Sequence, residues 1–169
     1  MSKVLVVHGT KSGCTAEIAA RIGERIAAAG LHVDVVAAHE APGAGGYDAV
    51  VVGSGIRAGQ WHEAARAWVA TNAEPLSRMP VATFTCGLTI TQGAEKAAEV
   101  ANYARPVFVA AGIEPISTGL FAGAYEPKRF SLLERAIMKA MKTPVGDFRD
   151  WDAIDVWADG VAHMLGQAA

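Results

Sequence analysis

The stretch "VVHGTKSGCT", residues 6–15, passes from apolar residues directly into a loop of hydroxyl-bearing and small residues. Residues 3–7 (KVLVV) do not alternate between polar and apolar, which is typical of a strand buried on both faces of a sheet. A helical pattern begins at Cys14, where isoleucines follow four residues apart. Because the first amide groups of a helix have no partner within the helix, this arrangement predicts an anion-binding loop.

Apolar runs alternate with helical patterns along the rest of the chain. Further strands are predicted at residues 31–36, 48–52, 81–85 and 116–122, and the alternation within residues 31–36 indicates an edge strand. Helices are predicted at residues 14–29, around 61–69, at 94–109 with a kink or division at Pro106, at 128–142, and at 151–165 with Asp150 as N-cap. Because each connection is long enough for a helix, the chain is expected to form one α/β domain, residues 1–169, in which helices cover both faces of a parallel sheet. Five strands in such a three-layer sandwich favour the order 2-1-3-4-5.

Composition and charge exclude several classes of protein. The chain has 169 residues, 51% hydrophobic and 19% charged, which is typical of a globular domain. A formal charge of −2 provides no basic field, so no nucleic-acid partner is expected. Cys14 and Cys86 lie too far apart for a disulfide framework or a metal cluster, so no metal site is predicted and a reducing cytoplasm is the expected location. We find no run of about 18 apolar residues, and the first apolar run is too short for a signal peptide.

Ligands of doubly wound parallel sheets bind beyond the carboxyl ends of the strands, near the point where the strand order reverses. The loops at that point are residues 9–15, 53–62 and 85–92. The first loop provides hydroxyl groups and a glycine through which the backbone can approach a ligand closely: Thr10, Ser12, Thr15 and Gly13. These donors, together with the positive end of a helix, predict a site for a phosphate group that needs no metal ion.

The same loop excludes three other kinds of site. A P-loop requires Lys after its second glycine, whereas Cys14 follows Gly13. The sequence GTKSGC does not match the G-x-G-x-x-G dinucleotide fingerprint. A response-regulator receiver needs acidic residues at the ends of its strands, and the strands here end in histidine, glycine and serine. A Ser/Thr helix cap without a ligand remains the alternative interpretation.

Several motifs resemble known families. Residues 10–15 (TKSGCT) resemble the FMN phosphate loop of flavodoxins, T-x-[TS]-G-x-T, at the expected position. Residues 56–62 (IRAGQWH) resemble the I-R-x-G-x-x-H run of the flavodoxin-like menaquinone-dependent protoporphyrinogen IX dehydrogenases. Residues 122–130 (AGAYEPKRF) and 135–142 (RAIMKAMK) resemble that family's opening after the fifth strand and its basic, Met-containing helix. The similarity is weakest at residues 86–105, where that family has a strongly basic insertion that this chain lacks.

The resemblance implies a flavodoxin-like fold and an FMN-dependent oxidoreductase that passes electrons from a small-molecule substrate, a porphyrinogen in that family, to a quinone. The implied FMN-binding residues lie in all three loops: Thr10, Lys11, Ser12, Gly13, Cys14 and Thr15 at the phosphate, and Ser54, Gly55, Ile56, Arg57, Ala58, Gly59, Cys86, Gly87 and Leu88 at the isoalloxazine ring. Lys11 and Cys14 are expected to contribute their backbone amides. For Cys86, the alternative is a small buried hydrophobe.

Arg57 and His62 are the predicted catalytic residues. The guanidinium of Arg57 matches the geometry of a substrate carboxylate, and a histidine with a pKa near ~6.5 can pass a proton. The alternatives are an exposed loop residue for Arg57 and a contact at the start of a helix for His62. Two other functions also remain open for the whole chain, an electron-carrying flavodoxin and an FMN-dependent quinone reductase, as does a flavodoxin fold that has lost its cofactor.

Residues 126–142 differ in charge from the rest of the chain. This segment has five basic and two acidic residues, a net charge of +3, which leaves the remainder near −5. Its apolar residues form a broad face: Phe130, Leu133, Ile137, Met138 and Met141. A basic amphipathic helix is typical of a membrane-surface element or a partner surface, and the alternative is an ordinary packed helix with solvated lysines. The pattern leaves the oligomeric state open.

Overall fold

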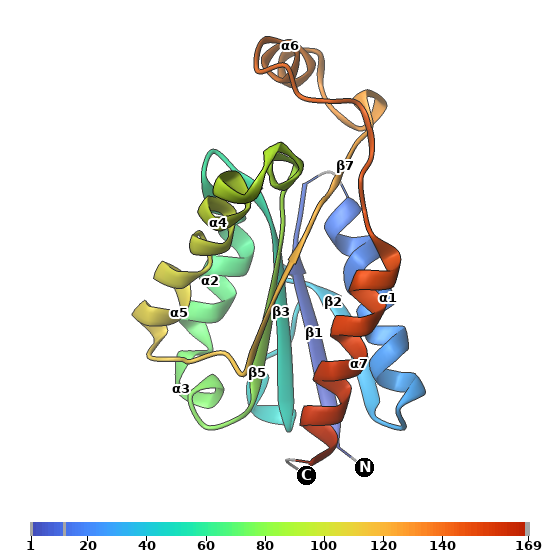
Figure 1. The fold of residues 1–169 in the computed structure, drawn as a ribbon. Helices are drawn as coiled ribbons and strands as arrows, with labels where there is room; N and C mark the ends of the chain where they lie inside the picture. The colour runs from blue at the N-terminus through green and yellow to red at the C-terminus, as the bar shows by residue number, and fades with distance from the viewer. Residues whose placement is uncertain (1, 12, 168–169) are drawn as a thin grey trace.

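The computed structural model describes residues 2–11 and 13–167, which form a parallel sheet between two layers of helices (Figure 1). The strands are β1 (Lys3–Gly9), β2 (His32–Ala37), β3 (Ala49–Arg57), β5 (Val81–Cys86) and β6 (Ser117–Phe121). They pair in the order β2-β1-β3-β5-β6, each pair parallel. The predicted order 2-1-3-4-5 is therefore confirmed, with the alternating strand β2 at one edge.

The two faces of the sheet explain why the central strands are continuously apolar. Val4 and Val6 of β1 belong to one hydrophobic core, and Leu5 and Val7 belong to the other. Successive side chains of a strand point to opposite faces, so a strand covered on both sides needs an apolar residue at every position.

Helices α1 (Cys14–Ala28) and α7 (Trp151–Gln167) cover one face of the sheet, where their side chains complete the core that contains Val4 and Val6 (Figure 1). Asp150 caps α7 as predicted, because the Ala153 N–H donates to its Oδ1 at 3.0 Å. Two ion pairs, Arg21–Asp155 and Arg25–Asp159, join α1 to α7 along their exposed sides.

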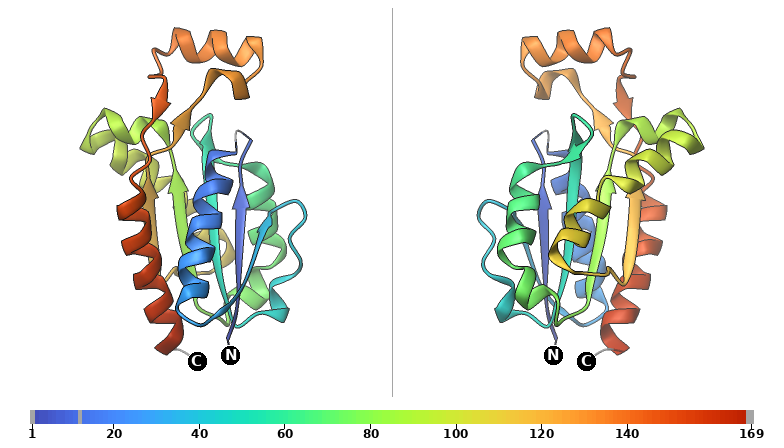
Figure 2. Two further views of the ribbon diagram at one scale, coloured as in Figure 1. Left: turned by 90° about the vertical axis from the view of Figure 1, so that its right-hand side faces the viewer. Right: turned by 90° about the vertical axis from the view of Figure 1, so that its left-hand side faces the viewer.

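The opposite face is covered mainly by α2 (Glu63–Thr71) and α5 (Arg105–Ala111) (Figure 2). The short segments η1 (Ala44–Gly46), α3 (Ala73–Leu76), η2 (Leu88–Gln92) and α4 (Ala94–Asn102) complete this side. The pattern predicted over residues 94–109 is divided into α4 and α5, with Pro106 in the first turn of α5. Proline is tolerated there because the first amides of a helix need no partner within the helix.

Strand β3 continues beyond its predicted end at residue 52. It turns at Ala58 and Gly59, and Ile56 and Arg57 then pair with β4 (Gln60–Trp61) in an antiparallel hairpin. Both turn residues have positive φ angles, 50° and 70°, as the type I′ turn of a two-residue hairpin requires. The hairpin extends the second ligand loop beyond the edge of the sheet.

The chain leaves the sheet after β6 and forms a protruding segment, residues 122–149, which we call the arm. Its base is a two-stranded ribbon of β7 (Ala124–Tyr125) and β8 (Gly146–Asp147), and its tip holds η3 (Pro127–Arg129) and α6 (Leu132–Ala140). The predicted continuous helix over residues 128–142 is therefore wrong at its start: α6 begins only after Ser131, whose backbone is extended. The arm rises from the carboxyl end of the sheet, opposite both chain termini (Figures 1 and 2).

Candidate functional site

The first predicted ligand loop connects β1 to α1 at the carboxyl end of the sheet. Gly13 has a φ of 88°, a left-handed conformation that favours glycine, and its N–H donates to Thr10 Oγ1 at 3.2 Å. The Gly13 carbonyl accepts from the Glu17 N–H at 3.2 Å, which starts α1 directly at the loop. Ser12, predicted to bind phosphate, lies outside the described residues. The described part of the loop thus places the amino end of a 15-residue helix beside a left-handed glycine.

Thr15 is the residue at which the three predicted loops meet. It is buried in the first turn of α1 and hydrogen-bonds to Cys86 at the end of β5. A Cβ atom at Gly55 would lie 3.1 Å from Thr15 Oγ1, so the second loop approaches the first where it has no side chain. The structure therefore brings together the loops that the sequence predicts to form one site.

Cys86 is buried, as its alternative interpretation expected. Burial raises the pKa of its thiol, and the neighbouring Cys14 acts in the same direction. The raised pKa disfavours the thiolate, which is the form in which a cysteine acts as a nucleophile. Gly87 and Leu88, which follow it, are half-buried at the rim of the site.

Ser54 connects the second loop to the helix that follows it. Its buried hydroxyl donates to the Gly55 carbonyl and accepts from the His62 N–H, each at 2.8 Å. His62 is the N-cap of α2, and its Nδ1 accepts from the Ala64 N–H at 3.3 Å. Both side chains therefore stabilise the start of α2. The contact at the start of a helix, considered for His62, is observed, and its proposed proton transfer would have to use Nε2.

The cations of the first two loops meet at a carboxylate of the arm. Lys11 Nζ forms an ion pair with Glu134 Oε1, and Arg57 Nη2 lies 3.4 Å from the same oxygen. The hydrogen bond from Lys11, followed by those from Ser131, lowers the pKa of Glu134 to about 2. Sequence reasoning missed Glu134 as a site residue. The S-x-x-E spacing of residues 131–134 could have identified it as part of a capping box, but not as a partner of Lys11.

A second arm residue, Arg129, lies beside the phosphate loop. A Cβ at Gly13 would lie 3.4 Å from its Nη1, which also donates to Glu17 Oε1 at 3.0 Å. Glu17 accepts from Arg149 as well, and these two hydrogen bonds, that of Arg149 first, lower the pKa of Glu17. The first turn of α1 is therefore bound to both sides of the arm, and a guanidinium that the sequence did not indicate faces the predicted phosphate site.

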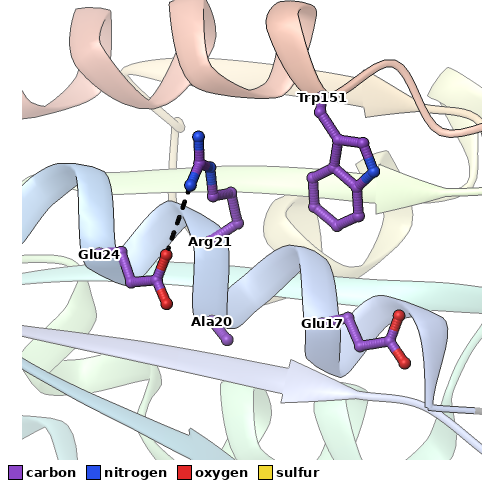
Figure 3. A pocket seen from close by; sticks show the side chains of 5 residues that line it. All are labelled: Glu17, Ala20, Arg21, Glu24 and Trp151. Carbon is purple, nitrogen blue, oxygen red and sulfur yellow. Dashed lines mark ion pairs between the residues drawn. The ribbon is translucent and has the colours of Figure 1, made fainter.

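Two hollows lie near these loops. One, of about 630 Å³, is bordered by α2 and by residues 38–43, and His62 contributes to its wall. The other, of about 440 Å³, lies between α1 and the start of α7, where Arg21 pairs with Glu24 at 3.6 Å (Figure 3). Glu17 and Glu24 both line this second hollow, and each is paired with an arginine.

The donor set fits the phosphate of FMN. The loop combines the amino end of a helix, the Thr10 hydroxyl, a left-handed glycine and two neighbouring cations, Lys11 and Arg129. Among the residues that the structure describes, no group of His, Cys, Asp and Glu could hold a metal ion. None of the described helices is long and apolar enough to cross a bilayer.

Comparison with known proteins agrees with this arrangement. The chain is 28% identical, over 96% of both sequences, to a protein named protoporphyrinogen IX dehydrogenase (quinone) from Escherichia coli K12. A protein of the same name from Leishmania major is 27% identical over 96% of this chain and 75% of its own length. The solved structure of oxidised flavodoxin 2 from Bacillus cereus superposes with a TM-score of 0.63 and 19% identity, covering 99% of this chain and 100% of that one. The family model of the flavodoxin domain matches residues 5–152, and the chain therefore belongs to the flavodoxin domain family.

Proposed function

We propose that the chain is an FMN-dependent oxidoreductase that oxidises a small-molecule substrate and transfers the electrons to a quinone. The observation that carries this proposal is the meeting of the three loops at Thr15, with a phosphate-type loop at the point where the strand order reverses. The names of the Escherichia coli and Leishmania major relatives support a porphyrinogen as substrate and a quinone as acceptor. The reducing cytoplasm is the proposed location.

Each loop would contact a different part of the cofactor. The amides of Cys14 and Thr15 and the Thr10 hydroxyl would hold the phosphate, with Ser12 and the Lys11 amide completing the set. The Gly13 N–H would join them by leaving Thr10 Oγ1, to which it donates at 3.2 Å. Residues 54–59 and 86–88 would border the isoalloxazine ring, and the absence of a side chain at Gly55 leaves its backbone accessible there. When bound, the flavin supplies the redox chemistry itself.

Arg57 and His62 would act on the substrate rather than on the cofactor. Arg57 is 59% exposed on its side chain and is held toward the first loop by Glu134, so a substrate carboxylate could replace Glu134 as its partner. The Nδ1 of His62 is used by the Ala64 amide, which leaves Nε2 to accept or donate a proton.

A pair of glycines tests FMN binding. Gly13 and Gly30 have nearly equal φ angles, 88° and 90°, but only Gly13 lies in the phosphate loop. Alanine at either position costs about 1–2 kcal/mol in backbone strain. We expect Gly13→Ala to weaken FMN binding at least tenfold, about 1.4 kcal/mol, and Gly30→Ala to leave it unchanged, as measured by calorimetric titration. Equal FMN affinity in both variants, or wild-type protein that binds no FMN, would contradict the proposed site.

The substrate is tested separately. Purified protein with FMN is mixed with protoporphyrinogen IX and menadione, and both porphyrin fluorescence and quinone reduction are followed. We expect porphyrin to form only when both the FMN-loaded protein and menadione are present. Fast one-electron cycling with a flavodoxin reductase, without porphyrin formation, would instead indicate an electron carrier. Quinone reduction driven by NADH alone would indicate the quinone reductase.

A further inference from the structure

Helix α6 turns its apolar side to solvent. Leu132, Leu133, Ile137 and Met141 are 81%, 72%, 50% and 64% exposed. Together with the exposed Ala136 and Ala140 they form a continuous surface along one side of the helix, which we call the apolar arc. Over this fully described helix no residue is buried. An ordinary packed helix, the alternative interpretation of this segment, would bury such a face.

Polar contacts hold the helix in this orientation. Glu134 binds Lys11 and Arg57, and the Nε of Arg135 donates to the carbonyls of Pro127 and Phe130 at 2.6 and 3.0 Å. Both residues lie on the side opposite the apolar arc, and both are half-buried. Rotating the arc inward would break these contacts, so its exposure is a consequence of how the arm is bound.

Basic residues surround the arc. Lys128, Lys139 and Lys142 are exposed, and none of them forms an ion pair with an acid among residues 2–11 and 13–167. The charge of Glu134 is already balanced by Lys11 and Arg57. The tip of the arm thus presents unpaired positive charge beside apolar side chains, on a chain that is otherwise acidic.

We propose that the tip of the arm docks on an anionic lipid bilayer, with the apolar arc in the interface and the three lysines among the headgroups. An amphipathic helix with lysines at its polar border suits this environment. A second copy of the chain fits less well, because the arc spans only about 14 Å of helix and a stable protein interface needs about 20–30 residues a side. One short helix gives weak, reversible binding to lipid.

This docking places the carboxyl end of the sheet toward the bilayer. Glu134, which binds Lys11 and Arg57, lies on the side of α6 opposite the arc, so the candidate site would face the membrane from just behind the helix (Figure 2). A lipid-soluble molecule could then reach the loops without crossing the bulk solvent. The docking itself rests on the arc and its lysines and does not depend on the proposed function.

The experiment measures co-sedimentation of the full chain with vesicles of phosphatidylcholine, with or without phosphatidylglycerol. The apolar variant is Leu133→Ser with Ile137→Ser. Its matched control is Val109→Ser with Val156→Ser, which changes residues that are 67% and 73% exposed on α5 and α7. A third variant replaces Lys128, Lys139 and Lys142 by Gln. Melting temperature and FMN titration of each variant verify that the fold and the candidate site are unchanged.

We expect wild-type protein and the control to bind the anionic vesicles and the apolar variant to bind at least about tenfold more weakly. Each lysine removed should weaken binding roughly fivefold on anionic vesicles. The proposal is overturned if wild-type protein does not bind anionic vesicles, if it binds neutral ones equally, or if the apolar variant binds like its control. Light scattering that shows a wild-type dimer dissociated by the apolar variant would also overturn it, because the arc would then be a protein interface.

Discussion

At the scale of single residues, Glu134 joins segments that lie far apart in the sequence. Its carboxylate accepts from Lys11, lies 3.4 Å from Arg57, and accepts from the Ser131 N–H and hydroxyl at 3.0 and 2.9 Å. Hydrogen bonds to an ionised group are stronger than neutral ones, and a side chain that is only 18% exposed is partly shielded from water. This residue therefore binds the start of α6 to Lys11 of the first loop and to Arg57 of the second.

The titration of Glu134 gives a prediction for acid pH. Its pKa is about 2 in the folded protein, below the ordinary value of 4.5, because Lys11 and Ser131 stabilise the ionised form. The unfolded or detached carboxyl binds its proton more readily, so this contact stabilises the arm fully above pH 4.5 and less and less as the pH falls toward 2. We expect the protection of residues 126–142 against amide hydrogen exchange to fall as the pH is lowered from 4.5 toward 2, after the rates are corrected for the intrinsic pH dependence of exchange.

The variant Glu134→Gln serves as control for that measurement. It cannot titrate, so its exchange in the arm should already be fast near neutral pH and should show no transition in the same interval. An arm whose protection in the wild-type protein stays constant down to pH about 3 would contradict the role of the carboxylate.

At the scale of elements, the start of α6 is decided by its cap. Residues 127–129 form only a turn of η3, and Phe130 and Ser131 are extended, so the helix begins where Ser131 Oγ accepts from the Glu134 N–H at 3.3 Å. The Glu134 carboxylate in turn accepts a hydrogen bond from the Ser131 N–H, which completes a capping box. A helix of nine residues is too short to be stable without such help.

Removing the cap should therefore affect α6 alone. We expect Ser131→Ala to lower the local stability of α6 by about 1 kcal/mol, seen as roughly fivefold faster hydrogen exchange in residues 132–140. The global melting temperature should not change, because α6 contributes no residue to the two cores of the described chain. Ser131→Thr, which keeps a capping hydroxyl, is the control and should behave like wild type. A lowered melting temperature in Ser131→Ala would show that α6 supports the sheet.

At the scale of the whole molecule, the arm is an appendage on a complete sheet. The two hydrophobic cores are built from the strands and from the helices that cover them, and the arm is attached through β7, β8 and ion pairs to Glu17, Lys11 and Arg57. The charge is divided in the same way, with net +3 in residues 126–142 and near −5 elsewhere. The sheet and its covering helices therefore provide the fold, and the arm provides a positively charged surface that the fold does not need.

Deleting the tip tests this separation. Replacing residues 127–144 by a short Gly-containing turn between Tyr125 and Gly146, which are paired in the ribbon, should leave a folded protein. We expect its melting temperature to fall by no more than about 4 °C, since the loss is confined to exposed and half-buried contacts outside the two cores and to the cover of Tyr125 by Phe130. Circular dichroism during heating measures this. An insoluble or non-cooperatively unfolding product would contradict the prediction.

The sequence by itself determined the strand order, the cap of α7 and the position of the loop between β1 and α1. These follow from local patterns: apolar residues at successive positions of β1 indicate two covered faces, Pro106 divides a helix, and Asp150 starts the last one. The extension of β3 into a hairpin was missed, because Arg57 and Gln60 flank an Ala-Gly turn whose positive φ at Ala58 is unusual for alanine.

Only the tertiary structure decided what surrounds the loop. Lys11 and Glu134 are 123 residues apart, and the outward orientation of the apolar arc depends on that pair and on Arg57. A helical pattern states which residues share a side of α6, but it does not state which side meets the protein. That choice rests on contacts between segments brought together by the whole fold, and no local pattern of the chain encodes them.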